Sequence, residues 1–70
     1  MAPLASQRKR LKRDEFDLHC YMIGKRKMMV IELAGHNSDC LGNYYRTGAG
    51  PEVRKDICSV LRVAEDRIWE

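Results

Sequence analysis

Five cationic side chains occur within six consecutive positions near the start of the chain: Arg8, Lys9, Arg10, Lys12 and Arg13. Such a cluster neutralises phosphates and releases their counterions when it binds nucleic acid. It can also serve as a nuclear import signal, contact an acidic protein surface or simply keep a tail soluble. We take binding to nucleic acid, or to a protein of the transcription machinery, as the leading interpretation.

A second group of cations, Lys25, Arg26 and Lys27, follows Gly24 at a predicted turn. Together with Arg46 and nearby tyrosines, these cations offer phosphate contacts and aromatic rings on which bases can stack. The more ordinary interpretation is that the tyrosines border the core and the lysines solvate the turn. The aromatic run typical of an RNA-recognition sheet is absent, so the cations are the candidate partner-binding residues.

Patterns that would indicate catalysis or metal binding are weak. A zinc site would have to use Cys20, His36, Cys40 and Cys58. These residues include no Cys-x-x-Cys pair, and free cysteine is commonly a small core residue. His19 and Cys20 would point to opposite faces of a strand, so they cannot act as a base and its nucleophile. We therefore predict a binding protein that is not an enzyme and that uses no metal or cofactor.

The composition fits one small globular domain, since 44% of the 70 residues are hydrophobic and 33% are charged. The positive charge is unevenly distributed. Residues 1–13 contribute +5 without any acid, whereas residues 14–70 hold eight basic and ten acidic groups, a net charge of −2. We predict a flexible basic arm over residues 1–13 and a single domain over residues 14–70.

The expected compartment is the cytoplasm, or the nucleus of a eukaryotic cell. An odd number of cysteines does not make a closed disulfide framework, and the start of the chain lacks the apolar region of a signal peptide. The longest apolar run, residues 28–33, is too short to span a bilayer. We therefore expect neither secretion nor a membrane partner.

A small antiparallel sheet is predicted for the first half of the domain. In residues 15–23, Phe16, Leu18, Cys20 and Met22 alternate with more polar residues, which is typical of a half-buried strand. Residues 27–34 are apolar on both faces and predict the returning strand of a hairpin. A short third strand is expected at residues 41–46, because a connection without structure over residues 35–50 would be unusually long.

A helix is predicted from Pro51 onward, with Gly50 as its N-cap. Its apolar stripe consists of Val53, Ile57, Val60, Leu61, Ala64 and Ile68, with Arg54 on the opposite, solvent-facing side. We favour one continuous helix to Ile68. The alternative is a break after Arg62 that lets Ile68 and Trp69 extend. The fold class is therefore α+β, with the helix packed across one face of the sheet.

The predicted function is a small regulator of the transcription type that contacts nucleic acid or its machinery through the basic arm. The alternative is a module or inhibitor that docks on a larger protein through a sheet edge or the C-terminal helix, where an exposed Trp69 would be a binding hot spot. A monomer or weak homodimer is expected. Residues 53–61, with Ile68, resemble the first helix of acyl carrier proteins, but the Asp-Ser-Leu attachment motif of that family is absent.

Overall fold

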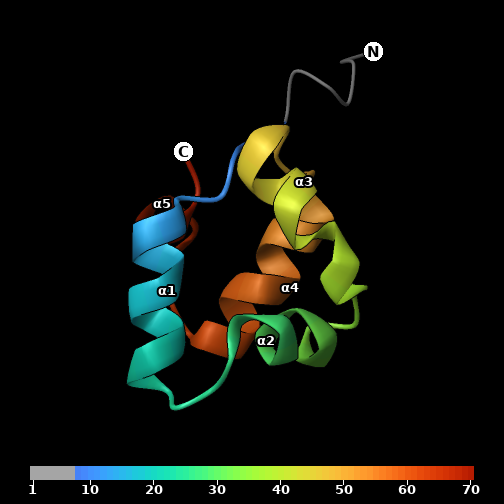
Figure 1. Ribbon diagram of the computed structural model, residues 1–70. Helices are drawn as coiled ribbons and strands as arrows, with labels where there is room; N and C mark the ends of the chain where they lie inside the picture. The colour runs from blue at the N-terminus through green and yellow to red at the C-terminus, as the bar shows by residue number, and fades with distance from the viewer. Residues whose placement is uncertain (1–7) are drawn as a thin grey trace.

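The computed structural model describes residues 8–70, and the regular secondary structure of this part of the chain is entirely helical. The elements are α1 (Arg13–Met22), α2 (Lys27–Leu33), the 3-10 turn η2 (Ser38–Cys40), α3 (Leu41–Arg46), α4 (Pro51–Leu61) and α5 (Glu65–Ile68). In Figure 1, α2 lies across the lower part of the molecule, while η2 and α3 climb beside it toward the N-terminal end. The predicted α+β fold with an antiparallel sheet is wrong, because the described residues form only two isolated bridges.

The first predicted strand, residues 15–23, lies in α1 and the turn that follows it. Phe16 and Cys20 are the buried residues of α1, and their spacing of four places them on one face of a helix. Leu18 and Met22, which completed the alternating pattern, are instead 50% and 67% exposed. Two acidic residues in the first turn further favour the helix through its dipole.

The second and third predicted strands are also short helices. α2 occupies the position of the strand at residues 27–34, and α3 that of the strand at residues 41–46. Val30 and Ile31 of α2 are fully buried, but the other face of this helix stays in solvent. Met, Leu and Glu favour helix, and packing of α2 against α4 stabilises an element too short to form alone.

The helix predicted from Pro51 is confirmed as α4, with Gly50 as its N-cap residue. α4 ends at Leu61 because Arg62 adopts the left-handed conformation, with φ 58°. The prediction of a continuous helix to Ile68 is therefore wrong. Of the alternative, the break at Arg62 and the extended Trp69 are observed, whereas Ile68 lies in a short helix rather than an extended segment.

The break allows the end of the chain to return to the core. The short helix α5 buries Ile68, and Trp69 follows it in an extended conformation. The ring of Trp69 meets that of Tyr44 edge to face, with 6.2 Å between the ring centroids. Trp69 is only 2% exposed, so it does not provide the exposed hot spot on which the docking alternative would have relied.

Arg54 was predicted on the solvent side of α4, yet it is buried. Its Nη1 donates to the carbonyl oxygen of Ala49 at 2.8 Å, and its Nε donates to the carboxylate of Glu65. These contacts explain the burial, because a buried guanidinium needs hydrogen-bond acceptors and an opposite charge. Arg54 thus connects the residues before and after α4.

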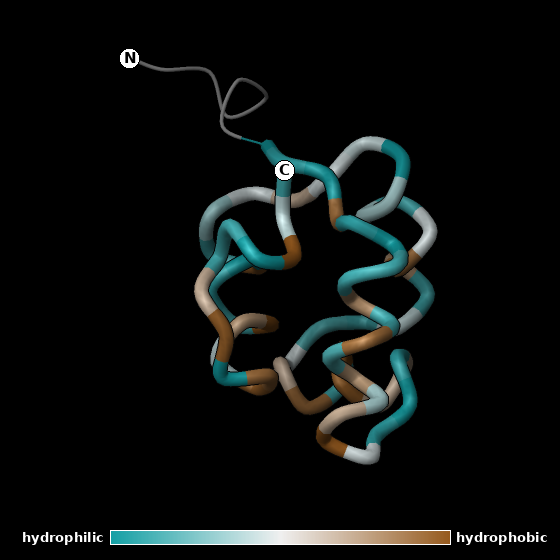
Figure 2. The backbone as a smooth tube through the Cα atoms, turned by 90° about the vertical axis from the view of Figure 1, so that its left-hand side faces the viewer, coloured by the Kyte–Doolittle hydropathy of each residue, from teal (hydrophilic) through white to brown (hydrophobic). Residues whose placement is uncertain are grey.

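Residues 8–12 form an extended segment inserted between two parts of the chain. On one side, Lys9 and Ala49 exchange two backbone hydrogen bonds of 3.2 and 2.9 Å. On the other, the amide of Glu70 donates to the carbonyl oxygen of Arg10 at 3.0 Å. Figure 2 shows the resulting proximity of the C-terminus to the start of the described chain.

The predicted flexible arm is therefore wrong for residues 8–13, which pack against the body. Leu11 in this segment is 3% exposed and belongs to the core, and α1 already begins at Arg13. The rest of that prediction, residues 1–7, lies outside the described residues. Within the part of the chain described, no helix has the length and apolar character needed to cross a membrane.

Candidate nucleic-acid interface

The segment cations are Arg8, Lys9, Arg10 and Lys12. The last three are anchored through their backbone, and the side chains of all four are exposed or half-buried. The guanidinium of Arg8 donates to the carbonyl oxygens of Thr47 and Gly48, at 3.4 and 2.7 Å. Lys12 Nζ donates to the carbonyl oxygen of Asp66 at 3.2 Å. None of the four forms an ion pair with a described residue, so their charges remain available to an anionic partner.

The turn cations, Lys25, Arg26 and Lys27, lie where α1 passes into α2. The turn predicted at Gly24 is present, with φ +70°, but it joins two helices rather than two strands. Lys25 and Arg26 are exposed. Lys27 pairs with Asp17 of α1, with 3.2 Å between Nζ and Oδ1.

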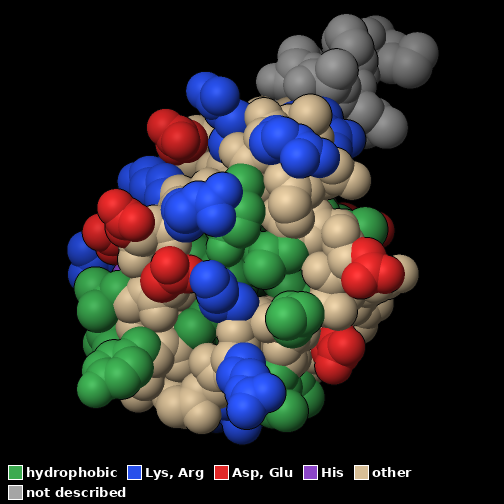
Figure 3. Space-filling model, in the orientation of Figure 1, with side chains coloured by type: hydrophobic (Ala, Val, Ile, Leu, Met, Phe, Trp, Pro, Cys, Tyr) green, Lys and Arg blue, Asp and Glu red, His purple; other side chains and the backbone are tan. Residues whose placement is uncertain are grey.

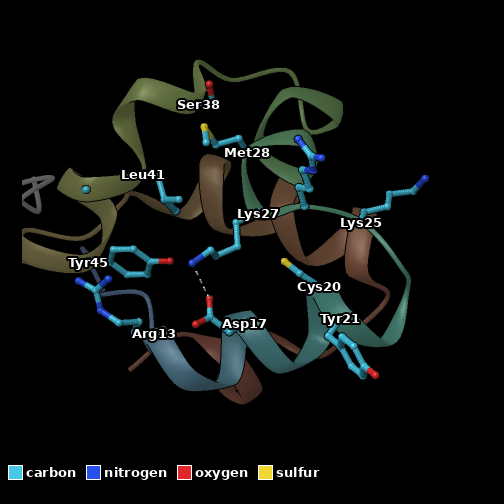
Figure 4. A pocket seen from close by; sticks show the side chains of 12 residues that line it. Arg13, Asp17, Cys20, Tyr21, Lys25, Lys27, Met28, Ser38, Leu41 and Tyr45 are labelled. Carbon is cyan, nitrogen blue, oxygen red and sulfur yellow. Dashed lines mark ion pairs between the residues drawn. The ribbon is translucent and has the colours of Figure 1, made fainter.

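A pocket of about 680 Å³ brings the turn cations together with Arg13 from the start of α1. We call it the α1–α3 pocket, because it lies between α1, the start of α2, η2 and α3 (Figure 4). Ser38 and Gly42 of the η2–α3 stretch also line it. The structure thus joins one end of the predicted basic arm to the predicted basic turn.

The electrostatics of the α1–α3 pocket centre on Tyr45. The guanidinium carbon of Arg13 lies 4.0 Å from the centroid of the Tyr45 ring, a cation–π arrangement. The Tyr45 hydroxyl oxygen is buried and has no hydrogen-bond partner among the described residues. Burial, followed by the negative charge of Asp17, raises the pKa of Tyr45 to about 12. Tyr45 therefore keeps its proton at neutral pH and can act as a hydrogen-bond donor.

The η2–α3 stretch turns polar residues outward next to the pocket. Asp39, Asn43 and Arg46 are exposed, whereas Tyr44 is buried behind them. Arg46 Nη2 donates to Asn43 Oδ1 at 2.9 Å, so the two side chains lie together on one face. Arg46 is thus close to the predicted surface, although it does not line the pocket.

Positive charge extends over a large part of one face of the molecule. Figure 3 shows Lys and Arg side chains from the top to the bottom of this face, while Asp and Glu side chains lie mainly toward its two sides. Hydrophobic side chains are visible between the cations. Such a surface can attract a polyanion over a distance and contact it closely.

The outward face of η2–α3 was not predicted, because residues 41–46 were expected to form a strand. One signal for the helix start was present. Asn37 is the N-cap of η2, and its Oδ1 accepts a hydrogen bond from the Asp39 amide at 2.9 Å. Asn is a preferred N-cap residue, so Asn37 marks the start of a helical stretch.

The cysteines do not form a metal site with the histidines. No group of three or more His, Cys, Asp or Glu residues is placed to hold a metal ion within residues 8–70. His36 instead contacts Asp56 of α4, with 2.8 Å between Nε2 and Oδ2. All three cysteines are free thiols, and Cys20 and Cys58 are buried.

The thiol of Cys20 is expected to resist alkylation although it lines the pocket. Burial, and then the charge of Asp17, raises its pKa from 9.0 to about 11. Near neutral pH, its thiolate fraction is then about 100-fold below that of an unperturbed thiol. Mass spectrometry after a short iodoacetamide treatment should find Cys40 labelled before Cys20 and Cys58. Labelling of Cys20 first would contradict the burial of this thiol.

The same shift predicts a loss of stability in alkali. The unfolded thiol ionises above 9.0, whereas the folded thiol stays protonated up to about 11. The free energy of unfolding should therefore fall as the pH rises through this window, and a Cys20→Ala variant should lose less stability over the same range.

The comparisons with known proteins add nothing to this geometry. The chain matches no protein-family model, no curated protein and no solved structure.

Proposed function

We propose that this protein binds duplex DNA through α2 and the η2–α3 stretch, as a small regulator without enzymatic activity. These two helical stretches are joined by the four residues 34–37, in which Gly35 has φ +87°. Two helices that cross after a short turn containing glycine form the arrangement of a helix-turn-helix unit. In Figure 1, the η2–α3 stretch runs across the direction of α2.

The second stretch of the unit has the side chains needed to contact base edges. A recognition helix enters the major groove and places a few polar residues against the bases. Asn43 and Arg46 are exposed on α3, and their side chains match adenine and guanine respectively. Their mutual hydrogen bond can be exchanged for bonds to the bases when DNA binds.

The observation that carries the proposal is that cations without an ion-pair partner among residues 8–70 surround this stretch. Lys25 and Arg26 precede α2, and Arg13 lies across the pocket that Ser38 and Gly42 also line. Phosphates border the major groove on both sides, so a helix in the groove requires cations beside it. The segment cations add charge at the other end of the η2–α3 stretch, near Thr47 and Gly48.

A salt titration tests the proposal. For random-sequence duplex DNA, the logarithm of the binding constant should fall linearly with the logarithm of the salt concentration. The slope should become less steep by about 0.9 for each phosphate contact removed. In the double variant Lys25→Ala/Arg26→Ala, the magnitude of this slope should decrease by about 2, and the affinity should fall about tenfold or more. Fluorescence anisotropy of a labelled duplex measures both quantities.

Lys55→Ala is the matched control, because Lys55 is an exposed cation on α4 that does not line the α1–α3 pocket. It should leave the slope nearly unchanged. Asn43→Ala should also keep the slope but reduce discrimination between sequences. Binding without salt dependence, or binding to double-stranded RNA as tight as to DNA, would refute the proposal, since a helix cannot enter the narrow major groove of RNA.

A second candidate is docking on a protein, because apolar side chains are exposed on α1 and α2. Tyr21 is 82% exposed, and Met28, Met29 and Leu33 are 48–60% exposed. Exposed apolar groups of this kind occur at protein interfaces. In a pull-down after nuclease treatment, a protein that binds the unchanged chain but not a Tyr21→Ser/Met28→Ser variant would favour this function over DNA binding.

DNA binding would place the protein in the bacterial cytoplasm or the eukaryotic nucleus. Three free cysteines are consistent with a reducing compartment of this kind.

A further inference from the structure

The α1–α3 pocket has the size of a small-molecule site. Its volume of about 680 Å³ falls in the range found for sites that hold drug-sized ligands. In Figure 4, side chains from α1, α2 and the η2–α3 stretch line it from different sides, with Lys27, Asp17 and Tyr45 meeting in the middle and Tyr21 and Lys25 extending outward. A concavity formed by three elements is unexpected in so small a domain, where most apolar contacts are needed for the core.

The floor and the rim of the pocket differ in chemistry. Met28, Leu41 and the ring of Tyr45 present carbon atoms to its interior. Lys25 and Arg26 stand at its rim, exposed and without an ion-pair partner among the described residues. Apolar walls beside unpaired cations are complementary to a ligand with an apolar body and one negative group.

The remaining charges in the pocket do not cancel this preference. Asp17 is the one carboxylate among the lining residues, and it pairs with Lys27. The buried hydroxyl of Tyr45 has no partner among residues 8–70, and Figure 4 shows it directed toward the side where Lys27 and Asp17 lie. Because this hydroxyl oxygen is buried, a ligand in the pocket would meet the ring of Tyr45 rather than its hydroxyl group.

We propose that the α1–α3 pocket binds a small organic carboxylate with a flat apolar body. The body lies on Met28, Leu41 and Tyr45, and the carboxylate is held by Lys25 and Arg26. This inference does not depend on DNA binding, because the pocket and its charges are present without DNA. Since both partners would use Lys25 and Arg26, the carboxylate would compete with DNA wherever both bind.

The test uses 2-naphthoate as the probe and 2-naphthalenemethanol as its neutral counterpart. In amide NMR spectra recorded without DNA, naphthoate should produce saturable shifts at Cys20, Met28 and Gly42, but not at Ser59 on α4. Its affinity should exceed that of the alcohol at least tenfold. Equal affinities of the two probes, or shifts spread over the whole domain, would overturn the inference.

Gly42→Leu provides a variant that fills the pocket. A Cβ atom at Gly42 meets nothing within 4 Å, and Gly42 lies in a helix, where leucine is better tolerated than glycine. This variant should bind naphthoate at least tenfold more weakly while keeping its helical circular dichroism. Unchanged binding in a folded Gly42→Leu protein would also overturn the inference.

Two further variants separate the contributions of charge and hydroxyl. Lys25→Ala/Arg26→Ala should reduce naphthoate binding to the level of the alcohol, while Lys55→Ala should leave it unchanged. Tyr45→Phe keeps the ring and should leave naphthoate binding nearly unchanged. Unchanged naphthoate binding in Lys25→Ala/Arg26→Ala would overturn the inference even if Gly42→Leu does not fold. DNA-induced shifts at these amides, without any naphthoate shifts, would refute the carboxylate site and leave the proposed function standing.

Discussion

The Trp69→Ala variant is expected to lose the cooperative unfolding transition of the domain. Trp69 is 2% exposed and packs edge-on against Tyr44. Its amide also donates to the carbonyl oxygen of Glu65 at 3.0 Å, which fixes the end of the chain. Truncation of a buried Trp costs about 3–5 kcal/mol, and a domain of this size has a total stability of only about 5 kcal/mol. The variant should therefore be largely unfolded at room temperature.

Urea titration followed by far-UV circular dichroism measures this effect. Fluorescence is unsuitable because Trp69 is the only tryptophan of the chain. Trp69→Phe, which keeps an aromatic ring, should retain a transition at lower urea. Tyr21→Ala, at a position 82% exposed, should behave like the unchanged protein. A Trp69→Ala midpoint close to that of Tyr21→Ala would show that the C-terminal residues do not pack as described.

The Gly48→Ala variant is expected to displace the N-terminal segment from the body. Gly48 has φ +88°, and an added Cβ would lie 2.6 Å from the carbonyl carbon of Lys9. Because that neighbour is backbone, no side-chain rotation can relieve the clash. We expect a loss of about 2–4 kcal/mol from the positive φ together with the lost contacts of residues 8–12. Amide hydrogen exchange should show loss of protection at Lys9 and Ala49.

Gly35→Ala is the matched control for this prediction. Gly35 has almost the same φ, +87°, but a Cβ there meets nothing within 4 Å. Its replacement should therefore cost about 1 kcal/mol, the strain of the left-handed conformation alone. Equal losses in the two variants would contradict the close approach of Gly48 to Lys9.

The extent to which the sequence predicts this fold depends on how local each signal is. The start of α4 was predicted correctly because Gly50 and Pro51 act within one helical turn. α1 was not predicted correctly, because two residues four positions apart, such as Phe16 and Cys20, lie on one face of a strand as well as on one face of a helix. Only the tertiary structure shows that Leu18, between them, faces solvent. Short apolar stretches such as α2 cannot be assigned from periodicity alone.

The candidate interface was predicted in its parts but not in its assembly. The cationic character of Arg13 and of the turn cations is evident in the sequence. Their convergence on one pocket depends on the turn at Gly24 joining two helices, which brings the start of α2 back toward α1. The roles of Tyr45 and Gly42 also required the helical assignment, because a strand would have placed them differently.

The position of residues 8–12 has a consequence for synthesis of the protein on the ribosome. This segment is held by Ala49 on one side and by Glu70 on the other, so its partners are made long after it. It cannot be held on both sides until residue 70 has left the exit tunnel, whereas α1 and α2 can already meet when the first half of the chain has emerged. Leu11 and the backbone around it therefore remain open to chaperones and proteases during translation, and closure of the domain is a late event.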